Sequence, residues 1–141
     1  MFILDTNVVS ELRKAKTGKA DANVVAWAAD QDPSALFLSA ITLVELEMGI
    51  RQMERLDSTQ GAVLRVWMAY RVFPAFEGRI LSVDGPVALC CTALHIPAPR
   101  SDRDALIAAT GITHAMPIVT RNVAAFELTG VQIINPWEPM K

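Results

Sequence analysis

Short apolar segments recur along the chain, separated by longer stretches whose apolar residues stand three or four positions apart. Most of the short segments lack regular polar alternation, which is typical of strands in a parallel sheet covered on both faces. We therefore predict five strands, at Phe2–Leu4, Leu36–Leu38, Ile80–Val83, Ile118–Thr120 and Val131–Ile134.

The stretches between these segments have the apolar spacing of helices. Strands that alternate with helices predict an α/β sandwich with right-handed crossovers. The proline-rich piece Ile96–Pro99 is too short to link domains and is predicted to be an extended approach to the next helix, so residues 1–141 are expected to form one domain. The predicted helices are Thr6–Leu12, Asn23–Ala29, Thr42–Arg55, Thr59–Val72, Pro86–Leu94, Asp102–His114 and the short Ala124–Leu128.

Composition narrows the class of protein. Of the 141 residues, 52% are hydrophobic and 20% are charged, which excludes a disordered chain and indicates a buried core. The longest apolar stretches, such as Ile41–Val44 and Pro86–Cys91, fall far short of the ~20 residues that a membrane helix needs. The N-terminus lacks the pattern of a signal peptide, so we expect a cytoplasmic protein.

Cys90 and Cys91 are adjacent and are the only cysteines, which favours two packed apolar residues over a disulfide framework or a zinc site.

The charge is nearly balanced. A formal net charge of −2 argues against broad electrostatic attraction to nucleic acid, although local basic clusters remain. Arg100 and Arg103 flank Asp102. On charge alone, each cluster is best interpreted as a solvated face. The larger cluster follows the first predicted strand and helix and consists of Arg13, Lys14, Lys16 and Lys19.

Asp5 ends the first predicted strand and is followed by Thr6 and Asn7. Ligands of open parallel sheets collect at the carboxyl ends of the strands, and a carboxylate, a hydroxyl and an amide there suit a hard cation such as Mg²⁺. The alternative is that Asp5 caps the helix that follows, since aspartate is a favoured N-cap. The sequence around Asp5 leaves both interpretations open.

Glu45 follows the second predicted strand and has apolar neighbours. In the first turn of a half-buried helix, its carboxylate would point toward the ends of the strands. Its alternative is a capping box with Thr42, because the two residues have the required spacing. Glu47 is a weaker candidate, since two positions along a helix carry it to a different face.

Asp104 lies in the first turn of a predicted helix whose small and aliphatic residues, Ala105–Gly111, allow close packing on the sheet. Ser101 and Asp104 have the spacing of a second capping box. Asp102 is in the same turn, where it is a candidate metal ligand, an outer hydrogen-bond acceptor or a partner of a neighbouring arginine.

A fourth element is the segment after the strand Ile118–Thr120. Asn122 offers an amide oxygen and Thr120 a hydroxyl at the same edge, while the alternative is an ordinary turn into a short helix. Neither His95 nor His114 pairs with a convincing nucleophile, and no glycine-rich nucleotide motif is present.

The three carboxylates share a placement after strands one, two and four. Asp5, Glu45 and Asp104 would repel one another unless cations neutralise them. Two divalent ions about 4 Å apart could bridge such carboxylates, activate water and stabilise the leaving oxygen of a phosphodiester.

Five motifs in order, spanning nearly the whole chain, resemble those of the PIN-domain ribonucleases. The resemblance is greatest to the VapC-type toxins of bacterial toxin–antitoxin pairs, including the Fit branch. The motifs are Leu4–Val8, Leu38–Leu46, Asp104–Thr110, Val119–Asn122 and Asn135–Trp137.

The resemblance implies a three-layer α/β/α sandwich with a central, mostly parallel sheet. It also implies an endoribonuclease that depends on Mg²⁺ or Mn²⁺ and uses the carboxylates of Asp5, Glu45 and Asp104, with Asn122 as a fourth site residue. The resemblance further implies a homodimer, with a higher assembly as a further candidate. It also implies inhibition by a small VapB-like antitoxin that inserts a segment into the active-site groove.

The chain departs from the family pattern at two positions. Asn122 stands where an aspartate is frequent, which weakens a second metal site, and Gly111 stands where alanine is usual, which should preserve helix packing.

The family resemblance also changes the interpretation of the residues around the site. Thr6, Asp102 and Thr120 become candidate supporting residues, with Asp102 outside the core motif. The resemblance places Arg13, Lys14 and Lys16 beside the metal edge, where they become candidates for binding RNA phosphates. Arg100 and Arg103 are further candidates for binding RNA.

Two other functions compete with this one. A phosphoacceptor receiver domain would use Asp84, but it needs a lysine near the end of the last strand, and none stands in Val131–Pro136. Asp84 is better interpreted as a helix cap before Pro86. The second alternative is a protein-interaction module that keeps the fold without useful turnover.

Overall fold

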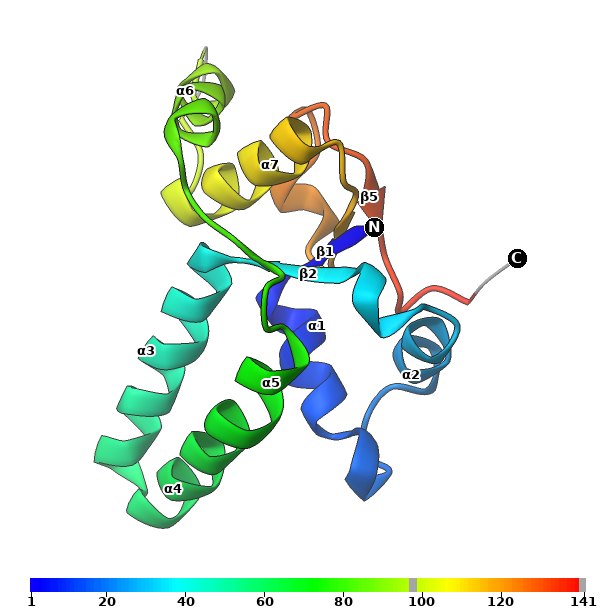
Figure 1. Ribbon diagram of the computed structural model, residues 1–141, viewed down its shortest axis with the longest axis vertical. Helices are drawn as coiled ribbons and strands as arrows, with labels where there is room; N and C mark the ends of the chain where they lie inside the picture. The colour runs from blue at the N-terminus through cyan, green and yellow to red at the C-terminus, as the bar shows by residue number, and fades with distance from the viewer. Residues whose placement is uncertain (97–98, 140–141) are drawn as a thin grey trace.

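The computed structural model describes residues 1–96 and 99–139 and contains a sheet of five parallel strands in the order β3-β2-β1-β4-β5 (Figure 1). The predicted parallel sheet is thus confirmed. The strands are β1 (Phe2–Leu4), β2 (Leu36–Ser39), β3 (Ile80–Leu81), β4 (Ile118–Val119) and β5 (Ile133–Ile134).

Three of the strands are shorter than predicted, for identifiable reasons. Thr120 leaves β4, and its hydroxyl joins the polar groups at the sheet edge. The backbone N–H of Val131 donates to Thr129 Oγ1 in a turn, so β5 begins only at Ile133. β3 ends at Leu81, shortly before Asp84 caps the next helix by accepting from the N–H of Val87 at 3.1 Å.

The helices alternate with the strands as predicted. A π-helical turn, Met68–Val72, joins α4 to α5, so the predicted helix Thr59–Val72 is an α-helix only in its first part. Single 3₁₀ turns lie at Ala15–Thr17, Pro33–Ala35 and Val123–Ala125. The helices are α1 (Thr6–Arg13), α2 (Ala22–Ala29), α3 (Ala40–Leu56), α4 (Ser58–Trp67), α5 (Phe73–Ala75), α6 (Gly85–Leu94) and α7 (Asp102–His114).

Two local predictions are wrong. The capping box of Thr42 and Glu45 does not form, because α3 begins two residues earlier and Ser39 caps it through the N–H of Ile41. The predicted helix Ala124–Leu128 is only a 3₁₀ turn, since Leu128 has a φ of +67°, which a right-handed helix does not allow. Of the segment predicted to be extended before α7, residues 97 and 98 lie outside the described residues.

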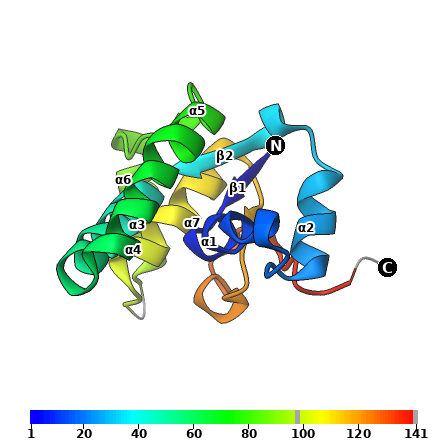
Figure 2. The ribbon, with the colours of Figure 1, turned by 90° about the horizontal axis from the view of Figure 1, so that it is seen from below.

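Alternating side chains of the sheet face two helical layers. Leu4, Leu38 and Val119 pack with α1, α2 and α3, whereas Ile3 and Ile118 pack against α7 on the opposite face. Figure 1 shows α6 and α7 on one side of the sheet and α1 to α5 on the other, and Figure 2 shows the second layer from below. The predicted three-layer α/β/α sandwich is therefore confirmed.

Small residues allow α7 to approach the sheet closely. A Cβ atom at Gly111 would lie 2.8 Å from Ile118 Cδ1 and 2.9 Å from the carbonyl oxygen of Met116. Glycine is thus required at this position in the observed packing, where alanine would force its neighbours to move. On its outer side α7 contacts α6 through Ala105, Ala109, Val87 and Cys91, which gives this cysteine the packing role predicted for it.

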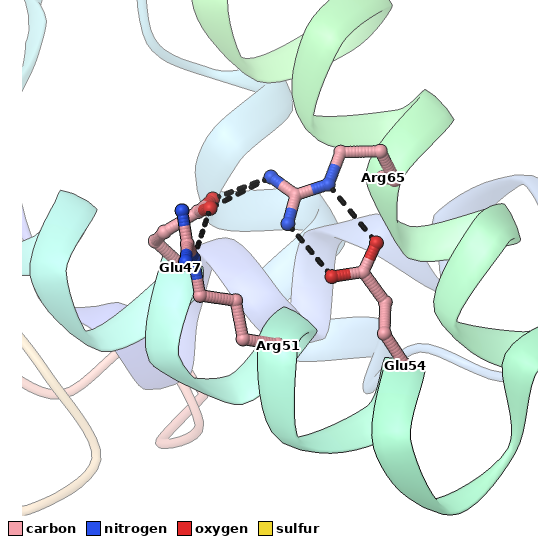
Figure 3. Close-up of polar contacts among 4 residues, drawn as sticks. All are labelled: Glu47, Arg51, Glu54 and Arg65. Carbon is pink, nitrogen blue, oxygen red and sulfur yellow. Dashed lines mark hydrogen bonds and ion pairs between the residues drawn. The ribbon is translucent and has the colours of Figure 1, made fainter.

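Helices α3 and α4 form an antiparallel hairpin that projects beyond the sheet (Figure 1). Arg65 of α4 lies between two glutamates of α3, with Nη1 2.6 Å from Glu47 Oε2 and Nη2 2.9 Å from Glu54 Oε1 (Figure 3). Arg51 contacts Glu47 from the other side, and the hydrogen bonds from both arginines lower the pKa of Glu47. Glu47 therefore belongs to the hairpin and not to the sheet edge.

Within the described ranges, no helix combines the length and apolar character needed to cross a membrane.

The hairpin depends on close contact at Gly61. A Cβ atom there would lie 2.5 Å from the Cα of Glu54, so Gly61→Ala should lower the free energy of unfolding by about 1–3 kcal/mol, despite the better helix propensity of alanine. A Cβ atom at Gly49 of α3 would meet no other atom within 4 Å, so Gly49→Ala should instead raise the free energy of unfolding by up to about 1 kcal/mol. Urea unfolding of both variants tests this contrast, and equal stabilisation would contradict it.

Candidate active site

Asp5 lies where β1 ends and α1 begins. The pairing of Leu4 with Val119 places Asp5 beside Thr120, whose hydroxyl donates to Asp5 Oδ2 at 2.7 Å. The other carboxylate oxygen accepts from the backbone N–H of Thr6 at 2.9 Å, so Asp5 also caps α1. The residue is only 6% exposed. The two interpretations of Asp5 are therefore compatible, because the cap holds the carboxylate at the sheet edge.

Asn7 joins the ends of β1 and β4. Its Nδ2 donates to Asp5 Oδ2 at 3.2 Å and to Thr120 Oγ1 at 3.1 Å, while its Oδ1 accepts from the N–H of Arg121 at 3.1 Å. This linking role was not predicted from the sequence, where Asn7 stood out only as an amide close to Asp5. The one signal available was its position two residues after the strand-end carboxylate.

Glu45 is held beside Asp5 by a threonine. Glu45 Oε1 accepts from the hydroxyl of Thr6 at 2.7 Å, and Thr6 Oγ1 also lies 3.5 Å from the hydroxyl of buried Thr42. Thr6 follows Asp5 directly, so one residue connects the two carboxylates. Thr42, considered as a cap from the sequence, instead contributes to this partly buried hydroxyl pair.

Asp104 completes the group from the opposite layer. Its N–H lies 3.5 Å from the hydroxyl oxygen of Ser101, which caps α7. This is the contact that the N-cap residue makes in the second predicted capping box. Burial raises the pKa of Asp104, and the negative charge of Glu45 raises it further. The pKa of Asp5 is also raised, chiefly by burial and additionally by the charges of Glu45 and Asp104, against the lowering effect of its hydrogen bonds. The structure thus brings the three carboxylates close enough to repel one another.

Arg103 partly compensates this charge. Its Nη1 lies 3.8 Å from Glu45 Oε2 and 3.8 Å from the sulfur of Met48, with the side chain half exposed. In the described part of the chain, it is the one basic residue that forms an ion pair with any of the three carboxylates.

The other predicted site residues lie farther out. Asn122 is exposed and reaches the group through its backbone N–H, which donates to Thr120 Oγ1 at 3.0 Å. Asp102 is 91% exposed and its Oδ1 lies 3.5 Å from His95 Nε2, so its partner is a histidine and not the neighbouring Arg100 or Arg103. Arg100 donates to the backbone carbonyl oxygens of Leu94 and Glu127.

The basic residues at the end of α1 and directly after it have separate surroundings. Lys14 pairs with Glu11 at 3.0 Å, Lys16 lies in the following 3₁₀ turn, and Arg13 stacks 6.0 Å above the Trp67 ring. Arg13 and Trp67 also line a hollow of about 210 Å³ that is open to Thr6 and Glu45.

The donor chemistry of this group suits a hard divalent cation. Carboxylate oxygens are the ligands that Mg²⁺ and Mn²⁺ prefer, and a cation would relieve the repulsion that adds to burial in raising the pKa of Asp5 and Asp104. Among residues 1–96 and 99–139, no three His, Cys, Asp or Glu side chains are placed so that they could together hold a metal ion in the conformation of this structure. Asp5, for example, directs both oxygens to protein donors.

Comparison with known proteins shows extensive similarity. Residues 2–130 match the PIN domain family model. The chain is 38% identical over 144 residues to the VapC ribonuclease Y4jK of Sinorhizobium fredii, with 99% of each chain covered. It is 33% identical to the toxin FitB of Neisseria gonorrhoeae, covering 97% of this chain and 99% of that one. The FitAcB crystal structure from the same organism superimposes with a TM-score of 0.88 at 33% identity, covering 98% and 99% of the two chains. The resemblance predicted from the motifs is thus confirmed.

The raised pKa of Asp5 makes stability depend on pH in the absence of divalent ions. An acid with a raised folded-state pKa favours the folded state at low pH, and this contribution is lost as the pH rises from its ordinary value of 3.8 through the raised one. Asp5→Asn removes the charge and keeps a residue that caps helices. In chelator, its stability relative to the parent should therefore increase between pH 4 and pH 7.

Asp32 provides a matched control with the opposite sign. Hydrogen bonds from Ser34 lower the pKa of Asp32 below its ordinary value of 3.8, so the parent gains stability from this group as the pH rises through the lowered pKa to 3.8. Asp32→Asn should therefore lose stability relative to the parent mainly below about pH 4 and change little between pH 4 and pH 7. Thermal unfolding at several pH values measures both differences. Parallel pH profiles for the two variants would argue against the crowded carboxylates.

Proposed function

The chain belongs to the PIN-domain family, and we propose that it is a metal-dependent endoribonuclease that hydrolyses RNA phosphodiesters. The observation that carries the proposal is the convergence of Asp5, Glu45 and Asp104 from two layers of the fold, where burial and, to a lesser extent, the neighbouring negative charges raise the pKa of Asp5 and Asp104. Mg²⁺ or Mn²⁺ would be held by these three carboxylates and, when bound, would activate water and stabilise the developing charge on the phosphate.

The chain's own residues would orient this centre. Thr120, Asn7 and the N–H of Thr6 fix the Asp5 carboxylate, and the hydroxyl of Thr6 fixes Glu45. Such preorganised dipoles need little rearrangement during the reaction. Asn122 would add an amide oxygen at the rim. The exposed carboxylate of Asp102 would act outside the metal-binding group.

RNA would be attracted by cations around the acidic centre. Arg103 lies next to Glu45 and would contact the substrate phosphate once a metal ion neutralises the carboxylates. Arg13, Lys14, Lys16 and Arg100 are assigned to flanking phosphates, with Arg13 best placed because it lines the hollow that contains Glu45.

We further propose that the chain is the toxin of a toxin–antitoxin pair. Two of the solved relatives are described as FitAcB and as FitAB bound to a DNA fragment. The hollow beside Glu45 adjoins a second, apolar hollow of about 230 Å³, and both are lined by Arg13 and Trp67. A segment of a small VapB-like antitoxin would occupy these hollows and exclude RNA. The active toxin would be a homodimer, with a larger assembly formed together with the antitoxin.

Cleavage of RNA is the direct test. Purified protein, freed of any partner, should cleave RNA with Mg²⁺ or Mn²⁺ and stop when a chelator is added. Asp5→Asn, Glu45→Gln and Asp104→Asn should each lose on the order of 100-fold or more in rate, because each removes a charge from the reacting centre. Gel analysis of labelled RNA over time gives these rates.

Asp84→Asn is the matched control, since Asp84 caps α6 and lies outside the carboxylate group. It should cleave RNA at the parent rate and should also show that no phosphoacceptor at this position is needed. Full activity in Asp5→Asn or Asp104→Asn would refute the mechanism. A folded parent without metal-dependent cleavage would favour the protein-interaction module.

A further inference from the structure

Arg121 and Trp137 form a pair at the β4 side of the carboxylate group that the proposed mechanism does not use. The guanidinium carbon of Arg121 lies 5.3 Å from the centroid of the Trp137 ring, a cation–π arrangement. The two residues are 16 positions apart and meet only because β4 and β5 are neighbours in the sheet.

The backbone of Arg121 is fixed relative to the active site. Its N–H donates to Asn7 Oδ1 at 3.1 Å, and Asn7 in turn binds Asp5 and Thr120. Arg121 thus follows directly on the residue whose hydroxyl binds Asp5. A ligand held by Arg121 would lie beside the reacting centre.

Trp137 is also held in place. Its carbonyl oxygen accepts from Asn23 Nδ2 at 2.8 Å, and its N–H donates to Asn135 Oδ1 at 3.0 Å. The ring is partly buried against the core that contains α1 and α2. The indole is therefore a rigid surface that orients the exposed guanidinium.

Stacking leaves the edge of a guanidinium free to donate hydrogen bonds. The planar group binds an aromatic ring with its face and a phosphate with its N–H groups, and it keeps its positive charge. No hydrogen bond or ion pair of the Arg121 side chain falls within the described residues. The nearby carboxylate of Glu11 is already bound to the N–H of Asp21 and to Lys14, and these contacts lower its pKa more than the charge of Arg121 does.

We propose that Arg121, oriented by Trp137, is a preformed binding site for a backbone phosphate of single-stranded RNA next to the cleaved bond. This inference rests on the proposed ribonuclease function. Arg121 supplies the charge and the hydrogen bonds, and Trp137 acts as a positioning residue. Together with Arg103 on the α7 side, the pair would place positive charge on both sides of the three carboxylates.

The test measures binding of a labelled single-stranded RNA oligonucleotide by fluorescence anisotropy at several salt concentrations. The protein carries Asp104→Asn, which prevents cleavage during the measurement. Adding Arg121→Gln should raise Kd about tenfold, because one phosphate contact is lost. The slope of log Kd against log salt concentration should decrease by the amount that one phosphate contact contributes. Arg121→Lys should keep the slope and raise Kd about threefold, because the charge remains and the stacked, planar geometry is lost.

Variants of Trp137 separate positioning from charge. Trp137→Leu should raise Kd about threefold with an unchanged salt slope, and it should have no further effect when Arg121 is already glutamine. Trp137→Phe keeps an aromatic ring and should bind nearly as the parent does, which also covers the case that leucine disturbs folding. Arg55→Gln is the matched control, because Arg55 is an exposed arginine near the far end of α3 and should leave Kd unchanged.

The outcomes distinguish this proposal from the function on which it rests. If Arg121→Gln binds RNA with the Kd and slope of its parent, the phosphate site is wrong, whether or not the native chain cleaves RNA. If Arg121→Gln and Arg55→Gln weaken binding equally, the effect is one of total charge and the site is again wrong. A native chain that cleaves no RNA with Mn²⁺ refutes the proposed activity, and one that binds no RNA refutes both.

Discussion

Burial of the Asp5 carboxylate at the end of β1 is the constraint on which the rest of the site depends. An ionised carboxylate removed from water is costly unless donors surround it, and here three side-chain and backbone groups do so. Each donor also has a different place in the fold, because Thr6 begins α1, Thr120 follows β4, and Asn7 links the two segments. The hydrogen bonds that offset the cost of the charge therefore also join the elements that carry the site.

The parallel sheet explains why this arrangement is possible. All five strands run in one direction, so the residues that follow them meet at one edge. Asp104 reaches that edge from the other helical layer only because α7 packs tightly on the sheet, an approach that the absence of a side chain at Gly111 permits. Packing and chemistry are thus coupled, since loosening α7 would move one of the three carboxylates.

The same edge also carries positive charge in an ordered form. Arg103 pairs with Glu45 on the α7 side, and Arg121 is stacked on Trp137 on the β4 side. A chain with a net charge of −2 can therefore present local cations to a polyanion, because their position and not their number determines the local field. The ion pairs of the α3–α4 hairpin serve a different purpose, since Glu47 and Glu54 bind Arg65 away from the sheet edge.

Local patterns along the chain were enough to predict a covered parallel sheet and to nominate three carboxylates as candidate site residues. Apolar runs without alternation identified the parallel strands, and the order of motifs selected Asp5, Glu45 and Asp104, because both signals are contained in short segments. Some local patterns gave wrong predictions. Thr42 and Glu45 have the spacing of a capping box, but Ser39 caps the helix. Other features depend on long-range contacts and are seen only in the tertiary structure. Among them are the bridging role of Asn7 and the pairing of Asp102 with a histidine. The separation of Glu47 from the site and the contact of Arg121 with Trp137 are further examples. These contacts join residues whose spacing in the chain carries no regular pattern, so they become visible only when the strands are placed side by side.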